Sequence, residues 1–289
     1  LACARQAHEF GYGTVVLQSG EDPGIEAQWM AEVIRRIRAE TPLAVTLSLG
    51  EREVDEFSLW RQAGADRYLL RFETSNRGLF ERIHPSRPNH VSDRIALLDI
   101  LRRLGYEIGS GVMIGIPGQT YEDLARDIET FRRLQLDMIG VGPYIEHPDT
   151  PLARADCRPA TSKEWQAPNS ELMTYKVVAL ARLVCPRSNI PSTTALATLN
   201  RHSGRELGLQ RGANVIMPNL TPIAYRAHYE IYPNKACVGE TAAACHTCTE
   251  ARIRGLGRRV GTGRGDSPSY KDRTSNGSAP STRESESCP

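Results

Sequence analysis

The sequence predicts an α/β protein built on a parallel β-sheet, and three observations carry that prediction. Short β-branched runs alternate with longer amphipathic segments along most of the 289 residues. Seven strand-then-helix units can be read in this way, and such alternation is typical of parallel sheets. An open doubly wound sheet is one possible architecture. The alternative is a (β/α)8 barrel of the TIM type, which needs eight units: the seven seen here and one that we expect to precede residue 1.

The expected strands are short and rich in Val, Ile, Leu and Thr. They cover residues 12–18, 43–49, 66–72, 108–116, 137–142, 189–194 and 213–217. The segments between them repeat apolar residues at i, i+3, i+4 and i+7, as in QWMAEVIRRIRAE and YEDLARDIETFRRLQ, and this spacing predicts helices. The Pro-rich stretch 144–169 predicts a long loop. From Gly255 large apolar side chains are almost absent, so we expect 255–289 to be disordered.

Composition and charge narrow the class of protein. Hydrophobic residues make up 40% and charged residues 24%, which is ordinary for a soluble globular chain, and the net charge is only +2. We therefore expect no nucleic-acid partner. No run reaches the roughly 20 apolar residues of a membrane helix, and we expect no membrane association. The seven scattered cysteines favour a reducing, cytoplasmic location over a disulfide framework.

Polar side chains break the apolar pattern where one expected strand after another ends. The candidates are Gln18, Ser19, Thr46, Ser48, Arg71, Glu73, Ser75, Thr193, Thr194 and Asn219. The carboxyl ends of barrel strands form one face, and reactive groups gather there. For Arg71 and Glu73 a structural ion pair is an alternative interpretation.

A glycine-rich turn follows one of these strands. The stretch MIGIPGQT leaves a buried strand through Gly115, Ile116, Pro117 and Gly118. Glycines there would let a flat ligand lie against the backbone, although a purely structural turn would use the same residues.

Three cysteines stand close together near residue 240. Cys237, Cys245 and Cys248 have the spacing C-x7-C-x2-C. They could bind zinc with His246 as a fourth ligand, or three irons of a cubane cluster with one iron left open. Unrelated thiols are the remaining alternative, and the spacing alone does not choose among metals.

Several motifs together resemble one family. VVLQSGED, VTLSLGE, GADRYLLRFETSN, MIGIPGQT, GVGPYIEHPDTPLA, NIPSTTA, GANVIMPNLTP and YPNKACVGETAAACHTC occur in an order that closely resembles the HydE family of [FeFe]-hydrogenase maturases. That family belongs to the radical S-adenosylmethionine (SAM) enzymes, beside biotin synthase and methylornithine synthase. The resemblance covers roughly residues 1–266 and implies a (β/α)8 barrel that holds SAM against a [4Fe–4S] cluster.

The resemblance also implies site residues. Those expected to bind SAM are Glu73, Ser75 and Arg94, with Gln18 close by and Ile116 and Pro117 against the adenosine. Those expected to line the substrate cavity are Thr46, Ser48, Arg67, Arg71, Thr193, Thr194, Met217, Tyr229 and Tyr232. Cys237, Cys245 and Cys248 would hold a second, peripheral cluster, [4Fe–4S] or [2Fe–2S].

One departure from the family pattern is large. The family's C-x3-C-x2-C loop, which binds the SAM-cleaving cluster, follows the first barrel strand, and this sequence does not contain it. We expect the first strand and this loop to be missing from the chain, and the chain alone to be inactive. The expected organisation is an incomplete barrel over 1–235, a cysteine segment over 236–254 and the tail over 255–289.

The resemblance finally implies a function for the parent protein. It would help to build the dithiomethylamine bridge of the hydrogenase H-cluster by 5′-deoxyadenosyl radical chemistry. The substrate would be an iron-containing, organometallic precursor, and the partners would be other hydrogenase maturation proteins. The alternatives are methylornithine synthase or another biotin-synthase-like enzyme, and a non-catalytic metal-binding barrel.

Overall fold

A parallel sheet of five strands forms the centre of the protein. The computed structural model describes residues 1–84, 91–154 and 165–275. The strands are β1 (Thr14–Gln18), β2 (Ala44–Ser48), β3 (Arg67–Leu69), β4 (Glu107–Ile114) and β5 (Met138–Pro143). They lie in the order β1-β2-β3-β4-β5, and each pairs in parallel with the next. The predicted α/β fold with a parallel sheet is confirmed.

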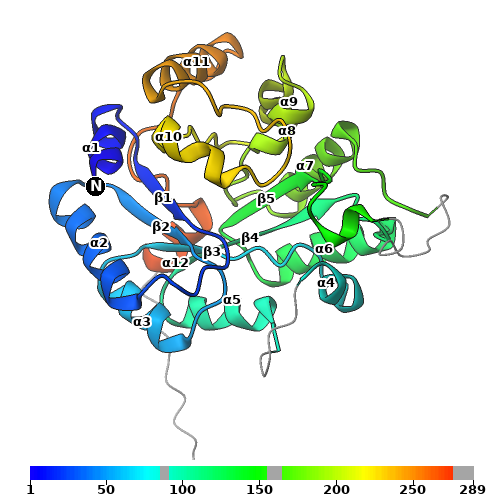
Figure 1. The fold of residues 1–289 in the computed structure, drawn as a ribbon, viewed down its shortest axis with the longest axis horizontal. Helices are drawn as coiled ribbons and strands as arrows, with labels where there is room; N and C mark the ends of the chain where they lie inside the picture. Colours follow the sequence, from blue (N-terminus) through cyan, green and yellow to red (C-terminus); the bar gives the residue numbers. More distant parts are fainter. Residues whose placement is uncertain (85–90, 155–164, 276–289) are drawn as a thin grey trace, which may run out of the picture.

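Helices cover the outer side of this sheet. They are α1 (Ala2–Glu9), α2 (Ala27–Glu40), α3 (Val54–Gln62), α4 (Arg77–Ile83), α5 (Arg94–Arg103), α6 (Tyr121–Arg133), α7 (Glu171–Val184), α8 (Thr194–Leu199), α9 (Gly204–Gln210), α10 (Ile223–Arg226), α11 (Ala242–Gly255) and α12 (Pro268–Ser275), with 3-10 turns η1 (Pro151–Ala153) and η3 (Ala227–Tyr229). In Figure 1, α2, α3, α5, α6 and α7 surround the strands, as in a barrel.

Two of the expected strands are present only as single bridges. Met138 pairs with Asn189, and Pro191 pairs with Val215, both in parallel. Pro191 has no N–H to donate, so it cannot continue a two-sided ladder. The segments 189–194 and 213–217 nevertheless follow β5 in the order in which the strands lie, each beside the segment before it.

The core lies between the sheet and the outer helices. Trp60 of α3 stacks on Tyr68 of β3 with ring centroids 6.5 Å apart, and Phe57 meets Tyr68 edge-on at 4.9 Å. All three side chains are fully buried. Aromatic pairs of this kind add about 0.5–1.5 kcal/mol to the stability that burial gives. The apolar stripe predicted for the helices is therefore the face that packs on the strands.

The amino ends of the strands are closed by the C-terminal segment 263–275. Ser267 is fully buried; its N–H donates to Glu107 Oε1 (2.6 Å) and its hydroxyl donates to Asp137 Oδ1 (3.0 Å). Arg273 of α12 donates to both oxygens of Asp137 at 2.7 Å. In Figure 1, α12 lies behind the strands near the centre of the view.

The order of this segment differs from the disorder expected for 255–289. Residues 255–275 are described with α12 in place, and 276–289 lie outside the described residues. The expectation counted only apolar burial, whereas polar groups fix this segment because buried carboxylates need donors. The C-terminal segment packs closely against the chain at Gly13, since a Cβ on Gly13 would lie only 1.7 Å from the carbonyl oxygen of Gly263.

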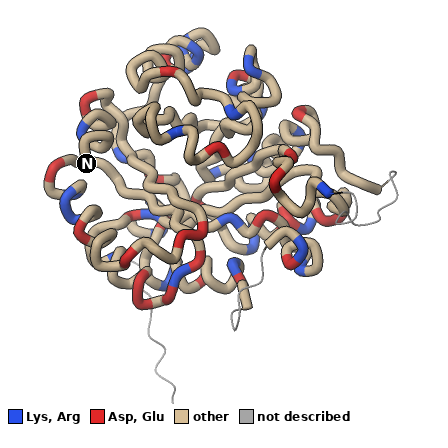
Figure 2. Tube along the Cα trace, in the orientation of Figure 1, with Lys and Arg blue, Asp and Glu red and all other residues tan. Residues whose placement is uncertain are grey.

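The distribution of charge and hydropathy is unremarkable for a globular chain. Figure 2 shows Lys and Arg interspersed with Asp and Glu along the described trace. Among the described residues, no helix combines the length and apolar character that crossing a bilayer requires.

Candidate functional site

The chain leaves β3 through a break in the ladder, and Glu73 lies at that break. The N–H of Phe72 bonds to the side-chain oxygen of Ser110 (3.2 Å) instead of a backbone carbonyl. Glu73 then pairs again with Val112 as an isolated bridge, at a φ of 60°. A non-glycine residue in the left-handed region is uncommon and costs roughly 1 kcal/mol. The fold therefore holds Glu73 in a strained conformation at the carboxyl end of the sheet.

Arg71 and Glu73 contact each other, as one alternative interpretation of the sequence predicted. Arg71 Nη2 lies 3.0 Å from Glu73 Oε2 and also donates to the carbonyl of Val112 at 2.7 Å. The ion pair does not meet hydrogen-bond geometry: Glu73 Oε2 and Arg71 Nε are both buried and have no hydrogen-bond partner. Buried polar atoms without partners are rare in folded proteins and mark places where a ligand can bind.

Ser75 does not share the face of Arg71 and Glu73. Its N–H and hydroxyl both donate to Asp127 Oδ1 of α6, at 2.5 and 2.6 Å. Burial raises the pKa of Asp127 to about 7, against the hydrogen bonds from Ser75, which lower it. Asp127 was not predicted from the sequence, although a carboxylate beside Leu124 and Ile128 on the apolar stripe of a helix is a usable signal.

Arg94, predicted to bind SAM, joins three strand ends. Nε donates to Glu51 Oε1, Nη2 to Glu21 Oε1 and Nη1 to the carbonyl of Arg71, each at 2.7 Å. Glu21 Oε2 in turn accepts the N–H of Glu51 (2.9 Å). Arg94 is buried, so these charge-assisted bonds are strong. The two carboxylates that engage Arg94 were not singled out in the sequence, although both directly follow predicted strands.

The turn containing Ile116 and Pro117 is held by two amides. Gln119 Oε1 accepts the N–H of Gly115 (2.6 Å), and Gln166 Nε2 donates to the carbonyl of Ile116 (3.1 Å). Gly115 has a φ of 81°, and a Cβ there would lie 2.2 Å from the backbone of Asn169. Ile116 is fully buried and Pro117 half-buried. The turn is therefore rigid, which suits a surface for a flat ligand.

Several predicted cavity residues come together around Arg71. Tyr232 feels the charge of Arg71, and Tyr229 lies close to Gln18. Burial raises the pKa of both tyrosines. The segment 227–232 thus lies over the carboxyl ends of the strands.

The other predicted cavity residues have varied surroundings. Thr193 Oγ1 donates to the carbonyl of Val141 (3.4 Å), and Thr194 begins α8. Thr46 is buried, Ser48 half-buried and Met217 exposed.

Arg67 is not brought together with these residues. It begins β3, at the opposite end of the sheet, and pairs with the buried Glu107 and with Asp266. Nη1 donates to Thr14 Oγ1 (2.7 Å) and Nη2 to the carbonyl of Arg264 (2.9 Å). The structure places Arg67 in the closure of the amino ends, because the first residue of a parallel strand lies far from its carboxyl end.

The three clustered cysteines line one cavity of about 150 Å³. Cys237 and Cys245 share a hydrogen bond that lowers the pKa of Cys245 and raises that of Cys237; the backbone N–H of Asn219 lowers the pKa of Cys245 further. Cys248 lies one turn after Cys245 on α11. In the described residues no three Cys, His, Asp or Glu side chains converge as a finished metal site. Three thiols that line the same cavity nevertheless fit a soft metal, since turning one χ1 angle relocates a sulfur.

His246 faces away from this cavity. Its ring stacks on Phe10 at 4.7 Å, and Nδ1 lies 3.0 Å from the hydroxyl of Tyr12. It does not line the cavity of the three cysteines. The zinc alternative with His246 as fourth ligand therefore finds no support in this geometry.

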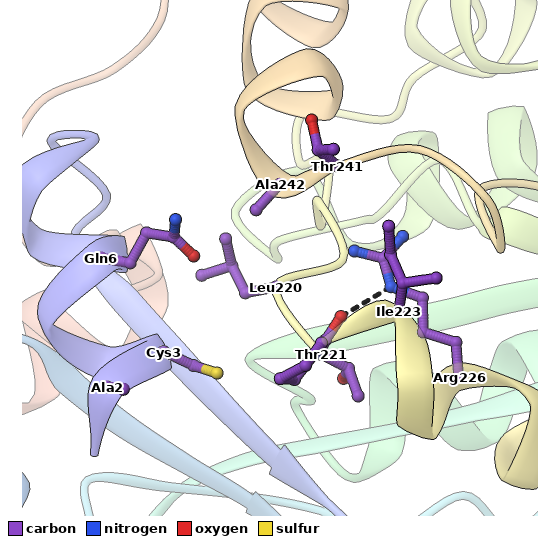
Figure 3. A pocket seen from close by; sticks show the side chains of 10 residues that line it. Ala2, Cys3, Gln6, Leu220, Thr221, Ile223, Arg226, Thr241 and Ala242 are labelled. Atoms are coloured by element: carbon purple, nitrogen blue, oxygen red, sulfur yellow. Dashed lines mark hydrogen bonds between the residues drawn. The ribbon is translucent and has the colours of Figure 1, made fainter.

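Arg226 organises the loop that carries Cys237. It is buried and donates to the backbone carbonyls of Thr221 (2.6 Å), Cys237 (3.0 Å) and Glu240 (2.7 Å). Figure 3 shows it beside a cavity of about 390 Å³, across which Cys3 and Gln6 of α1 face the loop. No carboxylate lines this cavity, and we assign it no chemistry.

Comparisons with known proteins agree with this geometry. The sequence profile of the Radical SAM superfamily matches residues 2–131. The [FeFe] hydrogenase maturase subunit HydE of Thermotoga maritima is 45% identical over 258 residues, which are 89% of this chain and 70% of that protein. Biotin synthase of Magnetococcus marinus is 32% identical over 155 residues, 53% of this chain and 47% of that protein.

A solved structure shows the same fold. The crystal structure of methylornithine synthase (PylB) superposes with a TM-score of 0.67 at 19% identity, over 94% of this chain and 74% of that one. The parallel sheet and the family match define a radical SAM enzyme. Within that class the chain belongs to the HydE family of [FeFe] hydrogenase maturases, as the resemblance predicted.

Radical SAM family membership implies SAM and a [4Fe–4S] cluster. The residues of this chain do not fit the cluster: the sequence has no C-x3-C-x2-C pattern, and the two further described cysteines, Cys3 and Cys185, lie in α1 and at the end of α7. We therefore assign no residue of this chain to that cluster.

Proposed function

We propose that the carboxyl-end network around Glu73 orients SAM in a maturase that acts on the dithiomethylamine bridge of the [FeFe]-hydrogenase H-cluster. The observation that carries the proposal is that two buried atoms, Glu73 Oε2 and Arg71 Nε, have no hydrogen bond among the described residues. A hydroxyl or amine of SAM would donate to Glu73 Oε2, and an acceptor of the neighbouring substrate would engage Arg71 Nε.

The surrounding residues have separate roles in this proposal. Glu73 accepts hydrogen bonds from the ligand, and Ser75 fixes the turn through Asp127. Arg94 holds the ends of three strands in place. The turn that contains Ile116 and Pro117 would lie against the adenosine, with the half-buried Pro117 as the accessible side chain.

The remaining cavity residues would receive the substrate. Arg71 provides positive charge, and the hydroxyls of Thr193, Thr194, Tyr229 and Tyr232 provide donors, which suits an anionic iron-containing precursor. Thr46, Ser48 and Met217 belong to the same proposal. The closing segment 227–232 would exclude water from the reacting groups. Partners would be other hydrogenase maturation proteins, in a reducing cytoplasm.

The cysteine segment forms an accessory site in this proposal. Cys237, Cys245 and Cys248 would hold a second cluster, [4Fe–4S] or [2Fe–2S], beside α9 and α11. The cavity that the three cysteines share supports it, because cysteine sulfurs are the ligands of such clusters.

A chimera tests the function. The chain would be joined to the strand and C-x3-C-x2-C loop of the Thermotoga maritima relative and used in place of that relative in an anaerobic hydrogenase-maturation mixture. We expect the mixture to yield active hydrogenase only when SAM is present and only when the chimera retains Glu73. An intact chimera that cleaves SAM yet yields no active hydrogenase would show that the substrate is a different one.

A further inference from the structure

Two of the three sulfurs of the cysteine site accept a hydrogen bond from an arginine. Arg205 Nη2 donates to Cys237 Sγ at 3.2 Å, and Arg252 Nε donates to Cys248 Sγ at 3.3 Å. The arginines come from two helices, α9 and α11, that line the shared cavity.

These two arginines are fixed by their surroundings. Arg205 is only 7% exposed, although it carries a full charge. Arg252 forms an ion pair with Glu206 of α9 and donates to the carbonyl of His202 (3.1 Å). Their guanidinium groups are thus held at the thiols, and a fixed N–H donor loses little side-chain entropy when it binds sulfur.

The charges around the cavity match a negatively charged metal–thiolate group. Three thiolates bound to a dipositive cluster core leave a net charge of −1. Arg201, Arg205 and Arg252 contribute +3, and Glu240 and Glu206 contribute −2, so the assembly is neutral. Without the arginines, the negative charge at the buried Cys245 and the half-buried Cys237 would lack compensation, and metal binding would carry a desolvation cost.

We propose that Arg205 and Arg252 are positioning residues of the cysteine site, which hold Cys237 and Cys248 and raise the reduction potential of an iron–sulfur cluster bound there. This inference rests on the proposed cluster. Hydrogen bonds to cluster sulfurs favour the reduced state, because reduction adds negative charge that N–H donors and a nearby cation stabilise.

Potentiometry of the reconstituted 289-residue chain is the test. Arg205→Gln and Arg252→Gln keep side-chain polarity but remove the charge, and Arg205→Lys and Arg252→Lys keep the charge but remove the planar fork. Arg254→Gln is the matched control: Arg254 lies on the same helix, pairs with Glu250 in an exposed ion pair and contacts no cysteine. Iron and sulfide content, the midpoint potential by electron paramagnetic resonance, and cluster release to bathophenanthroline disulfonate would be measured.

We expect each Gln variant to shift the ratio of oxidised to reduced cluster about tenfold toward the oxidised form at a fixed potential, equal to a midpoint fall of about 59 mV for one electron. Cluster release should be several-fold faster. The Lys variants should fall between the Gln variants and the unchanged chain, and Arg254→Gln should match the unchanged chain.

The outcomes separate this inference from the proposed cluster. If the unchanged chain takes up no iron and sulfide, the cluster proposal is wrong and this one falls with it. If it takes up a cluster but the arginine variants keep its potential and release rate, only the role of the arginines is wrong. Should a Gln variant fail to fold by circular dichroism, the Lys variant decides: an unchanged potential and release rate there would overturn the inference.

Discussion

Arg71 Nη2 lies 3.0 Å from Glu73 Oε2, yet Glu73 Oε2 has no hydrogen-bond partner in the described residues. The pair is close enough for charge attraction but is not a finished salt bridge. Glu73 also has a φ of 60°, which the packing of neighbouring strands must enforce. Both features indicate a residue placed for a ligand instead of for the fold.

We predict that Glu73→Gln weakens ligand binding more than it destabilises the chain. Losing one charge-assisted hydrogen bond costs about 1.5–3 kcal/mol, or roughly 10- to 150-fold in affinity. Isothermal titration calorimetry with S-adenosylhomocysteine measures the ligand affinity, and this probe can be added to protein that carries no cluster. Thermal unfolding measures the stability of the ligand-free chain. Glu81→Gln is the control, since Glu81 makes one exposed ion pair with Arg77. A marked fall in the melting temperature of Glu73→Gln with unchanged affinity would mean that the pair is structural.

The 289-residue chain by itself should bind at most one iron–sulfur cluster and should not cleave SAM. Its only closely spaced cysteines are Cys237, Cys245 and Cys248. Anaerobic reconstitution followed by iron and sulfide analysis counts the clusters, and chromatography after addition of dithionite and SAM detects 5′-deoxyadenosine. Production of 5′-deoxyadenosine above background would show that the SAM-cleaving site was assigned wrongly.

Cys245→Ser should abolish the cluster of the isolated chain. Cys245 is the buried member of the set and lines the same cavity as Cys237 and Cys248. Cys3→Ser, at a half-buried thiol on α1, should leave iron content unchanged. In the chimera, Cys245→Ser should leave SAM cleavage largely intact, and a loss of cleavage in a folded variant would contradict the accessory role.

Stability should depend on pH through Asp127. Burial raises its pKa to about 7 from the ordinary aspartate value of 3.8, so the folded chain binds this proton more tightly than the unfolded chain between those pH values. The resulting stability is present at low pH and is lost as the pH rises through 7. From pH 5 to 8.5 the unchanged chain should lose about 2–3 kcal/mol relative to Asp127→Asn. Urea unfolding across this range measures the difference, and parallel profiles would contradict the prediction.

The C-terminal closure should contribute measurably to stability. Arg273→Gln removes two hydrogen bonds to the fully buried Asp137, and we expect a loss of roughly 1.5–3 kcal/mol. Arg187→Gln removes an exposed ion pair between Arg187 and Asp272, which lies on α12 beside Arg273. This loss should cost less than about 1 kcal/mol. Denaturant unfolding compares the two variants. Equal losses would show that α12 is held by general surface charge.

Local pattern was enough to predict most elements. The period of apolar residues located β1 to β5 and the long helices within a few residues, because burial on one face requires that period. The motifs at strand ends also predicted Glu73, Arg71 and Gln18 on one face, since parallel strands end together. Family membership followed from the order of those motifs and is confirmed.

Partners across long stretches of sequence were decided only by the tertiary structure. Ser75 is separated from Asp127 by 52 residues, and Arg67 from Asp266 by 199, so no local pattern could pair them. The C-terminal segment is poor in apolar residues and predicts disorder when read alone. Its order arises because Glu107 and Asp137, buried at the amino ends of strands, need donors that only folding brings to them. The sequence by itself determined the period of its elements and the thiols of its cysteine site, whereas the strained Glu73 and the arginines at the sulfurs depend on packing between distant segments.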